Sequence, residues 1–103
     1  MEFVETPIFT KLVQTTLSAD EYRAFQLYLV LWPDRGDVIA GSGGLRKIRW
    51  RLAGRGKRGG VRVIYYWKSD TSQIYLLFLY PKSVRSDLSL PELRILRNLV
   101  TDG

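Results

Sequence analysis

The sequence contains no cysteine and no histidine. Without cysteine there is no disulfide, thiol nucleophile or thiolate metal site. The absence of cysteine is also compatible with a reducing compartment. Without histidine there is no imidazole base, no Ser–His–Asp triad and none of the usual zinc sites. Any acid–base chemistry must therefore use Lys, Asp, Glu or Tyr side chains. We expect no bound metal and no other cofactor.

Long apolar runs and a secretion signal are also missing. No stretch approaches the roughly 20 apolar residues of a transmembrane helix, and the first nine residues carry acids where a signal peptide needs basic residues. We therefore expect a cytoplasmic protein that makes no use of a membrane. The length of 103 residues, with 46% hydrophobic and 25% charged residues, predicts one folded domain over residues 1–103.

Acidic residues are absent from the middle of the chain. Residues 38–69 hold nine of the 16 Lys and Arg residues and no Asp or Glu, whereas residues 1–37 carry more acids than bases. Like charges at this density repel one another, and such a block usually persists because a polyanion or an acidic partner completes it. A solvated, solubilising face is the alternative interpretation.

Local patterns predict helices first and strands afterwards. Pro7 suits the first turn of a helix, and the capping boxes Ser18/Glu21 and Ser89/Glu92 each predict a further helix start. The other predicted elements are strands over residues 2–6, 45–53, 61–68 and 73–80, with a possible short strand at 38–39 and a glycine-rich basic loop at 54–60. This order predicts an α+β fold, in which a small antiparallel sheet carries two N-terminal helices on one face, with a short C-terminal helix. We expect Trp32 and Trp50 to lie in the core.

The predicted strand over residues 45–53 alternates with a period of two. Lys47, Arg49 and Arg51 share one face, and Arg62 opens the next strand across the loop. Residues opposite each other on paired strands are about 5 Å apart, so these cations are mutually destabilising unless an anion lies among them. A phosphodiester is the natural anion, because Arg binds it bidentately and Lys binds it as a point charge.

Further cations and aromatic residues extend this candidate site. Tyr80 and Lys82 lie at the end of the last strand, where functional sites are often located. Aromatic residues in the run 65–67 could stack on bases but are more often core residues, and we single out Tyr66 because it shares a face with Arg62. The residues that we assign to nucleic-acid binding are Arg46, Arg51, Arg55, Lys57, Arg58, Tyr66, Lys68 and Arg85.

Two other nucleotide chemistries are disfavoured. The glycine-rich segment 41–44 lacks the strand–loop–helix context of a phosphate-binding loop. The absence of acids from residues 38–69 argues against a two-metal nuclease.

Three segments of the chain match a known pattern. They are Leu-Arg-Lys-Ile-Arg at 45–49, Lys-Arg-Gly-Gly-Val-Arg-Val-Ile-Tyr-Tyr at 57–66, and the tail with Tyr80, Lys82, Ser86, Asp87 and Leu88. Together they resemble the RelE/ParE toxin superfamily, and within it most closely the HigB-type toxins. The resemblance covers nearly the whole chain and implies the RelE-like fold, a small antiparallel sheet packed against two N-terminal helices.

The resemblance also implies a function and its partners. It implies a toxin of a type II toxin–antitoxin module that enters the 30S A site of the ribosome and cleaves translated mRNA. The implied partners are a cognate HigA-like antitoxin with a DNA-binding helix-turn-helix domain, the ribosome and mRNA, with operator DNA contacted only through the antitoxin. The implied catalytic residues are Lys47, Arg49, Arg62, Lys82 and Tyr80, with Arg62 binding the scissile phosphate.

The general base stays open at this point. Where ribonuclease members carry an aromatic acid–base residue, this chain has Leu88 and Ser89. Lys47, Tyr66 and Tyr80 are the candidates, and the cations around Lys47 favour its neutral amine form. The expected reaction is metal-independent attack of a 2′-OH on its own phosphodiester, which leaves a 2′,3′-cyclic phosphate and a 5′-OH. The alternatives are a non-enzymatic ParE-like inhibitor of DNA gyrase and a plain RNA- or ribosome-binding module.

Overall fold

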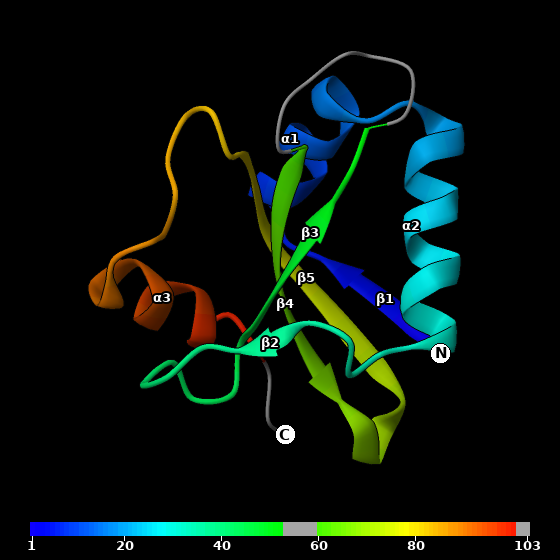
Figure 1. Ribbon diagram of the computed structural model, residues 1–103. Coiled ribbons are helices and arrows are strands. Elements are labelled where there is room, and N and C mark those ends of the chain that lie inside the picture. The colour runs from blue at the N-terminus through cyan, green and yellow to red at the C-terminus, as the bar shows by residue number, and fades with distance from the viewer. Residues whose placement is uncertain (53–59, 101–103) are drawn as a thin grey trace.

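The computed structural model describes residues 1–52 and 60–100, and the fold over these residues is α+β (Figure 1). In chain order the elements are β1 (Glu2–Glu5), α1 (Pro7–Thr16), α2 (Ala19–Leu31), β2 (Asp37–Val38), β3 (Arg46–Trp50), β4 (Val61–Lys68), the 3-10 helix η1 (Ser69–Thr71), β5 (Gln73–Pro81) and α3 (Leu90–Arg97). The predicted order, with two helices before the main strands and one after them, is confirmed.

The strands form one mixed sheet in the order β1-β5-β4-β3-β2. The β2–β3, β3–β4 and β4–β5 pairs are antiparallel, as predicted, but β1 pairs parallel with β5. Tight turns enforce antiparallel pairing, whereas most of the chain separates β1 from β5, so no turn dictates the direction of β1. Leu77 has no partner in the β4–β5 register, which marks a β-bulge in β5.

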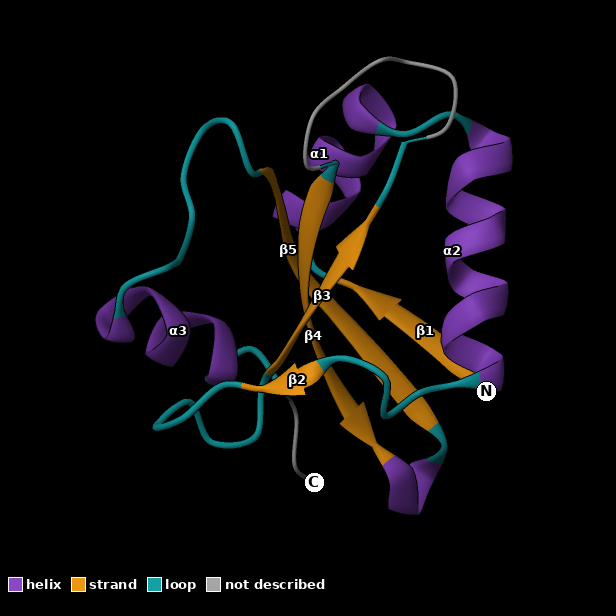
Figure 2. Cartoon of the chain, viewed as in Figure 1, coloured by secondary structure: helices purple, strands orange, loops and turns teal. Residues whose placement is uncertain are grey.

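Helices cover both faces of the sheet (Figure 2). α1 and α2 pack on one face, where Phe9, Phe25 and Leu29 meet Val63 and Tyr65 in a fully buried cluster. α3 packs on the opposite face; the residues of this second cluster are Leu45, Ile64, Tyr75, Leu77, Tyr80, Leu93, Leu96 and Val100. Because α3 is short, it covers only part of its face, and the rest of that face carries the candidate site.

The helix starts are those that the capping patterns predicted. Ser18 and Glu21 form a reciprocal capping box at the start of α2, and Ser89 and Glu92 form another at the start of α3. Thr6 caps α1 and also donates its hydroxyl hydrogen bond to the Leu77 carbonyl, at 2.8 Å. α1 is thereby tied to the central strand β5.

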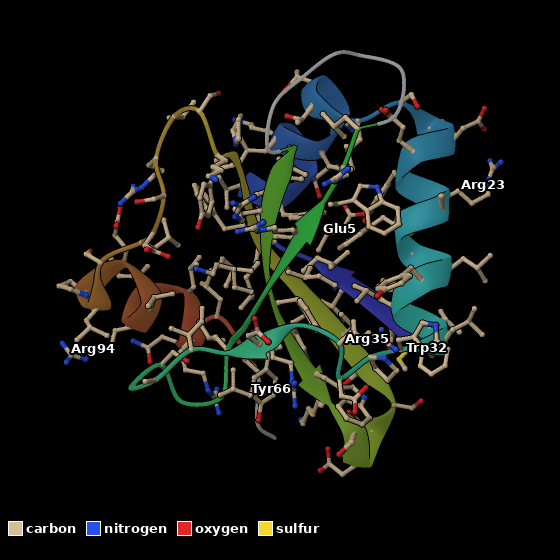
Figure 3. All side chains as sticks on the ribbon, viewed as in Figure 1. Glu5, Arg23, Trp32, Arg35, Tyr66 and Arg94 are labelled. Atoms are coloured by element: carbon tan, nitrogen blue, oxygen red, sulfur yellow. The ribbon has the colours of Figure 1, made fainter. Side chains whose placement is uncertain are left out.

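One predicted core residue is not in the core. Trp32 follows the last turn of α2 and is 48% exposed, and the guanidinium of Arg35 lies 4.8 Å from its ring centroid (Figure 3). Trp32 is the C-cap of α2, and its indole lies at the surface against Arg35 before the chain turns into β2. Trp50 packs against the core cluster as predicted, in edge contact with Phe25 and beside Tyr28.

Candidate nucleic-acid interface

A row of polar side chains crosses three strands on the α3 side of the sheet. Arg49 of β3 pairs with Arg62 of β4, which pairs with Tyr80 of β5. Directly paired residues of neighbouring strands lie on the same face, about 5 Å apart. Lys47 lies two residues before Arg49 in β3 and therefore on that face too. The period of two seen in the sequence thus brings four of the predicted catalytic residues together.

Lys47 is not surrounded by cations alone. Its ammonium donates a hydrogen bond of 2.5 Å to the carboxylate of Asp87, which comes from the segment between β5 and α3. This hydrogen bond, reinforced by the charges of Lys47 and Arg62, holds the pKa of Asp87 below its usual range. The expectation of a neutral amine surrounded only by like charges is therefore corrected, because the fold brings an acid from 40 residues further along the chain.

Tyr80, the third member of this row, is buried in the core cluster on the α3 side of the sheet. Its hydroxyl donates a hydrogen bond to the carbonyl of Ser86, at 3.1 Å. Burial raises the pKa of Tyr80, and the nearby charges of Lys47 and Arg62 oppose this rise only in part. At neutral pH the side chain is accordingly a neutral phenol, suited to donating a hydrogen bond and poorly suited to accepting a proton.

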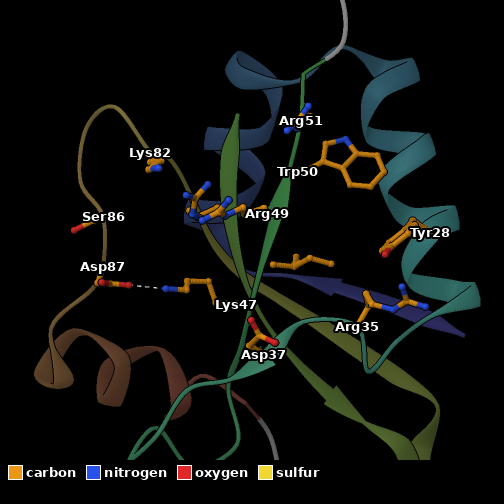
Figure 4. Close-up of a pocket in the computed structure, with 12 residues that line it drawn as sticks. Tyr28, Arg35, Asp37, Lys47, Arg49, Trp50, Arg51, Lys82, Ser86 and Asp87 are labelled. Carbon is orange, nitrogen blue, oxygen red and sulfur yellow. Dashed lines mark hydrogen bonds and ion pairs between the residues drawn. The ribbon is translucent and has the colours of Figure 1, made fainter. Parts of the chain in front are cut away.

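An open groove of about 780 Å³ runs over β3, from the segment after β5 to α2, and all of the residues described above except Tyr80 line it (Figure 4). Its lining residues are Tyr28, Arg35, Asp37, Lys47, Ile48, Arg49, Trp50, Arg51, Arg62, Lys82, Ser86 and Asp87. Cations outnumber acids in this lining, so the groove suits an anionic ligand. Within residues 1–52 and 60–100 no group of acidic side chains is arranged to hold a metal ion.

The five predicted catalytic residues stand at different depths. Arg62 and Tyr80 are almost fully buried, at 4% and 3% exposed, whereas Arg49 and Lys82 are exposed and Lys47 is half-buried. Lys82 lies at the end of β5, across the groove from β3 (Figure 4). Arg49 and Lys82 are thus the two predicted catalytic residues most accessible to a ligand in the groove.

Several residues assigned to nucleic-acid binding have other partners. Arg46 lies on the opposite face of β3 and donates hydrogen bonds to the carbonyls of Asp34 and Gly36, at 3.0 and 2.8 Å. Arg85 forms a two-point ion pair with Glu92, with nitrogen–oxygen distances of 2.9 and 2.7 Å. Both guanidinium groups stabilise the fold around the groove, and neither lines it.

The remaining members of that set are scattered. Tyr66 lies beside α3, with the guanidinium of Arg97 4.6 Å from its ring centroid, and Lys68 is buried at the far end of β4. Neither lines the groove, whereas Arg51 does. Arg55, Lys57 and Arg58 lie outside the described residues. Tyr66 is thus too far along its strand to serve as the general base for chemistry at Arg62.

Several groove residues were not assigned a role from the sequence, among them Asp87, Tyr28 and Arg35. In the sequence, Asp87 appears only as part of the tail motif. The one sequence feature that could have indicated its role is that an acidic residue close to a basic segment is a natural ion-pair partner. Tyr28 and Arg35 come from α2 and the turn after it, and they reach the groove because α2 packs beside Trp50. No local pattern marks them, since their position depends on helix packing.

Comparisons with known proteins agree with this fold. Residues 34–102 match the model of the family described as the RelE toxin of the RelE/RelB toxin–antitoxin system. The free-state structure of an arginine-to-alanine double mutant of E. coli toxin RelE superposes with a TM-score of 0.63, at 12% sequence identity, over 95% of this chain and 97% of that one.

Together with the α+β fold, the family match identifies the chain as the toxin component of a toxin–antitoxin pair. The chain belongs to the RelE toxin family, since the family model matches more than half of it. A partner antitoxin follows from this membership. None of the described helices is long and apolar enough to cross a membrane.

Proposed function

We propose that this toxin is a ribosome-dependent endoribonuclease of the HigB type, which cleaves mRNA in the 30S A site without a metal ion. The observation that carries the proposal is the row Arg49–Arg62–Tyr80, with Lys47 and Lys82 around the same groove. Because translating ribosomes are cytoplasmic, the proposed activity would take place in the cytoplasm. We also propose that residues 1–103 form one domain.

The reaction follows from the chemistry of RNA. The 2′-OH of the substrate attacks the adjacent phosphorus, the bond to the 5′-oxygen breaks, and the products are a 2′,3′-cyclic phosphate and a 5′-OH. The nucleophile is already intramolecular, so the protein must orient it, stabilise the phosphorane charge and move two protons. Arg62 and Lys82 hold the phosphate oxygens, and Arg49 adds charge at the mouth of the groove.

Lys47 is the residue that we assign as general base. Tyr66 lies too far away, and Tyr80 is kept protonated by its burial. Arg49 is excluded because a guanidinium does not deprotonate in proteins. A charged ammonium accepts no proton, so this assignment requires two steps: Asp87 separates from Lys47 when RNA binds, and the Lys47 ammonium then releases a proton to solvent before the 2′-OH attacks. Tyr80, as a neutral phenol, donates its one hydroxyl proton to the Ser86 carbonyl and so positions the segment that carries Asp87.

The experiment that tests the proposal is primer extension on a defined mRNA in a reconstituted translation reaction. Wild type should cleave within A-site codons, and Arg62→Ala should cleave about 100-fold less or worse. Arg23→Ala is the matched control, because Arg23 points outward from α2 and its side chain is 78% exposed (Figure 3). Because Arg62 is buried, Arg49→Ala and a circular dichroism spectrum of each variant separate lost chemistry from lost folding.

The outcomes distinguish the alternatives. Translation arrest without cleavage would indicate an RNA- or ribosome-binding module. Growth arrest with intact mRNA and a DNA-damage response would indicate a gyrase inhibitor of the same fold. We further propose that the antitoxin is HigA-like, carries a helix-turn-helix domain and provides the only contact with operator DNA; co-purification from the native operon, followed by operator binding with and without the antitoxin, tests this.

A further inference from the structure

Asp87 is held in the groove by anchors on both sides. On one side the Tyr80 hydroxyl donates to the Ser86 carbonyl, and on the other the Arg85 guanidinium donates to the Asp87 carbonyl, at 3.2 Å. Arg85 is itself fixed by its two-point pair with Glu92 of α3. The backbone is therefore positioned independently of the Asp87 side chain, and its carboxylate is directed at Lys47.

We propose that Asp87 is an internal counter-anion of the groove, which occupies Lys47 until an RNA phosphate displaces it. This inference rests on the proposed function: Asp87 would limit the binding of RNA at that same site. The carboxylate and a phosphate carry the same sign of charge and compete for the same ammonium. Free RNA must replace the Asp87–Lys47 pair before it gains Lys47 as a contact, so its affinity is lowered.

The exposure of the pair argues against a purely structural role. The side chains of Lys47 and Asp87 are 33% and 67% exposed, and ion pairs this accessible to water contribute little to stability. The segment is already fastened by Tyr80 and by the Arg85–Glu92 pair. Asp87 lies in a cationic groove and is not needed to hold its own loop. We therefore assign it an effect on the binding of anionic ligands by the groove.

The arrangement accounts for dependence on the ribosome. A toxin whose groove bound free RNA strongly would be titrated by bulk cellular RNA. A ribosome that presents mRNA next to the toxin raises the effective concentration of the phosphate, which overcomes a competitor of modest strength. Asp87 thus weakens capture of free RNA more than cleavage of presented mRNA.

The test measures binding, separately from cleavage. Fluorescence anisotropy of a single-stranded RNA with 2′-O-methyl groups, which removes the nucleophile, gives the Kd of wild type and Asp87→Asn over a range of salt concentrations. We expect Asp87→Asn to bind roughly 2- to 5-fold more tightly at low salt, the factor that corresponds to one exposed ion pair. Its salt dependence should steepen by about 0.7, because one more cation becomes available to a phosphate of a single strand.

Two comparisons isolate the pair. Asp70→Asn changes the net charge equally but lies in η1, outside the groove, and should alter the Kd much less. In a Lys47→Ala background the gain from Asp87→Asn should shrink, since the competitor then has no ammonium to occupy. A gain of equal size with and without Lys47, or an equal gain from Asp70→Asn, would overturn the proposal.

Failure of the proposal is distinguishable from failure of the proposed function. Equal or weaker RNA binding by Asp87→Asn overturns the role of Asp87, as does an absence of RNA binding by both proteins. The primer-extension experiment decides ribosome-dependent cleavage separately in either case. A thermal melt of Asp87→Asn within about 4 °C of wild type verifies that the variant is folded.

Discussion

Arg49 and Arg62 stand directly opposite each other across β3 and β4, so two guanidinium side chains occupy one cross-strand pair. Like charges in this position destabilise a sheet. Arg62 is also buried, which removes much of the water that would screen it. The repulsion between the two guanidinium groups is offset in part by the nearby Asp87 carboxylate, and a bound phosphate would offset it further.

The first prediction concerns this pair. Arg49→Gln removes one of the two facing charges, so we expect the free energy of unfolding to rise by about 0.2–1 kcal/mol while mRNA cleavage falls. Urea denaturation at low and high salt measures the first effect, and the gain should shrink at high salt. Arg23→Gln, on the outer face of α2, should change stability by less than about 0.5 kcal/mol. A less stable Arg49→Gln would contradict the electrostatic interpretation.

The second prediction concerns Tyr80. Tyr80→Phe removes the hydroxyl that holds the Ser86 carbonyl at the groove, so we expect cleavage to fall by roughly 10- to 100-fold. Since burial raises the pKa of Tyr80, its hydroxyl stays protonated in wild type. The pH–rate profile of the variant should therefore keep the wild-type shape between about pH 6 and 9. A basic limb that disappears in Tyr80→Phe would instead identify Tyr80 as the general base.

The third prediction concerns the buried hydroxyl of Tyr65. It accepts a hydrogen bond from the Gly36 amide, at 2.9 Å, and donates one to the Pro33 carbonyl, at 2.8 Å. Tyr65→Phe leaves the buried Gly36 amide without this partner, and we expect it to destabilise the protein by about 1–3 kcal/mol. Tyr28→Phe is the control, because the Tyr28 ring packs on Trp50 and its hydroxyl makes no hydrogen bond to the described residues. Chemical denaturation measures the free energy of unfolding of both variants. An equal decrease for Tyr65→Phe and Tyr28→Phe would refute the structural role of the Tyr65 hydroxyl.

The fourth prediction is a pH dependence of stability. Hydrogen bonds from Arg85, and then from Ser89, lower the pKa of Glu92 to about 2. In the unfolded chain the pKa is near the ordinary value of 4.5, so between these values the unfolded state binds more protons. The contribution of Glu92 is therefore complete above about pH 4.5 and is lost as the pH falls toward 2.

Glu92→Gln provides the comparison for this prediction. Urea midpoints of wild type and Glu92→Gln at a series of pH values should differ most at neutral pH and converge toward pH 2. The same substitution weakens the capping box of α3, and this second effect does not change with pH. A difference between the two proteins that stays constant over the whole range would refute the pKa assignment.

Much of the fold follows from local sequence. The capping boxes Ser18/Glu21 and Ser89/Glu92 mark helix starts because the first amides of a helix need acceptors, whatever the rest of the chain does. The alternation in 45–53 likewise places Lys47 and Arg49 on one face, because side chains of a strand alternate whatever it pairs with. The grouping of Arg49, Arg62 and Tyr80 required only that consecutive strands pair as hairpins.

The same reasoning fails where contacts join distant parts of the chain. Tryptophan is a large hydrophobic residue typical of a core, yet Trp32 is exposed at the end of α2, where its ring contacts Arg35. Arg46 was assigned to nucleic-acid binding as part of the basic strand, although alternation places it on the face opposite Lys47, and its guanidinium donates to the carbonyls of Asp34 and Gly36. The parallel pairing of β1 with β5 is in the same category, since no short connection sets its direction.

The sequence by itself determined the helix starts, the basic strand face and the chemistry that the absence of histidine and cysteine leaves open. Only the tertiary structure decided that Asp87 pairs with Lys47 and that Tyr66 lies away from the site. The reason is physical. Alternation and capping depend on neighbours within a few residues, whereas the partner of a charged side chain depends on which segments the buried core brings together.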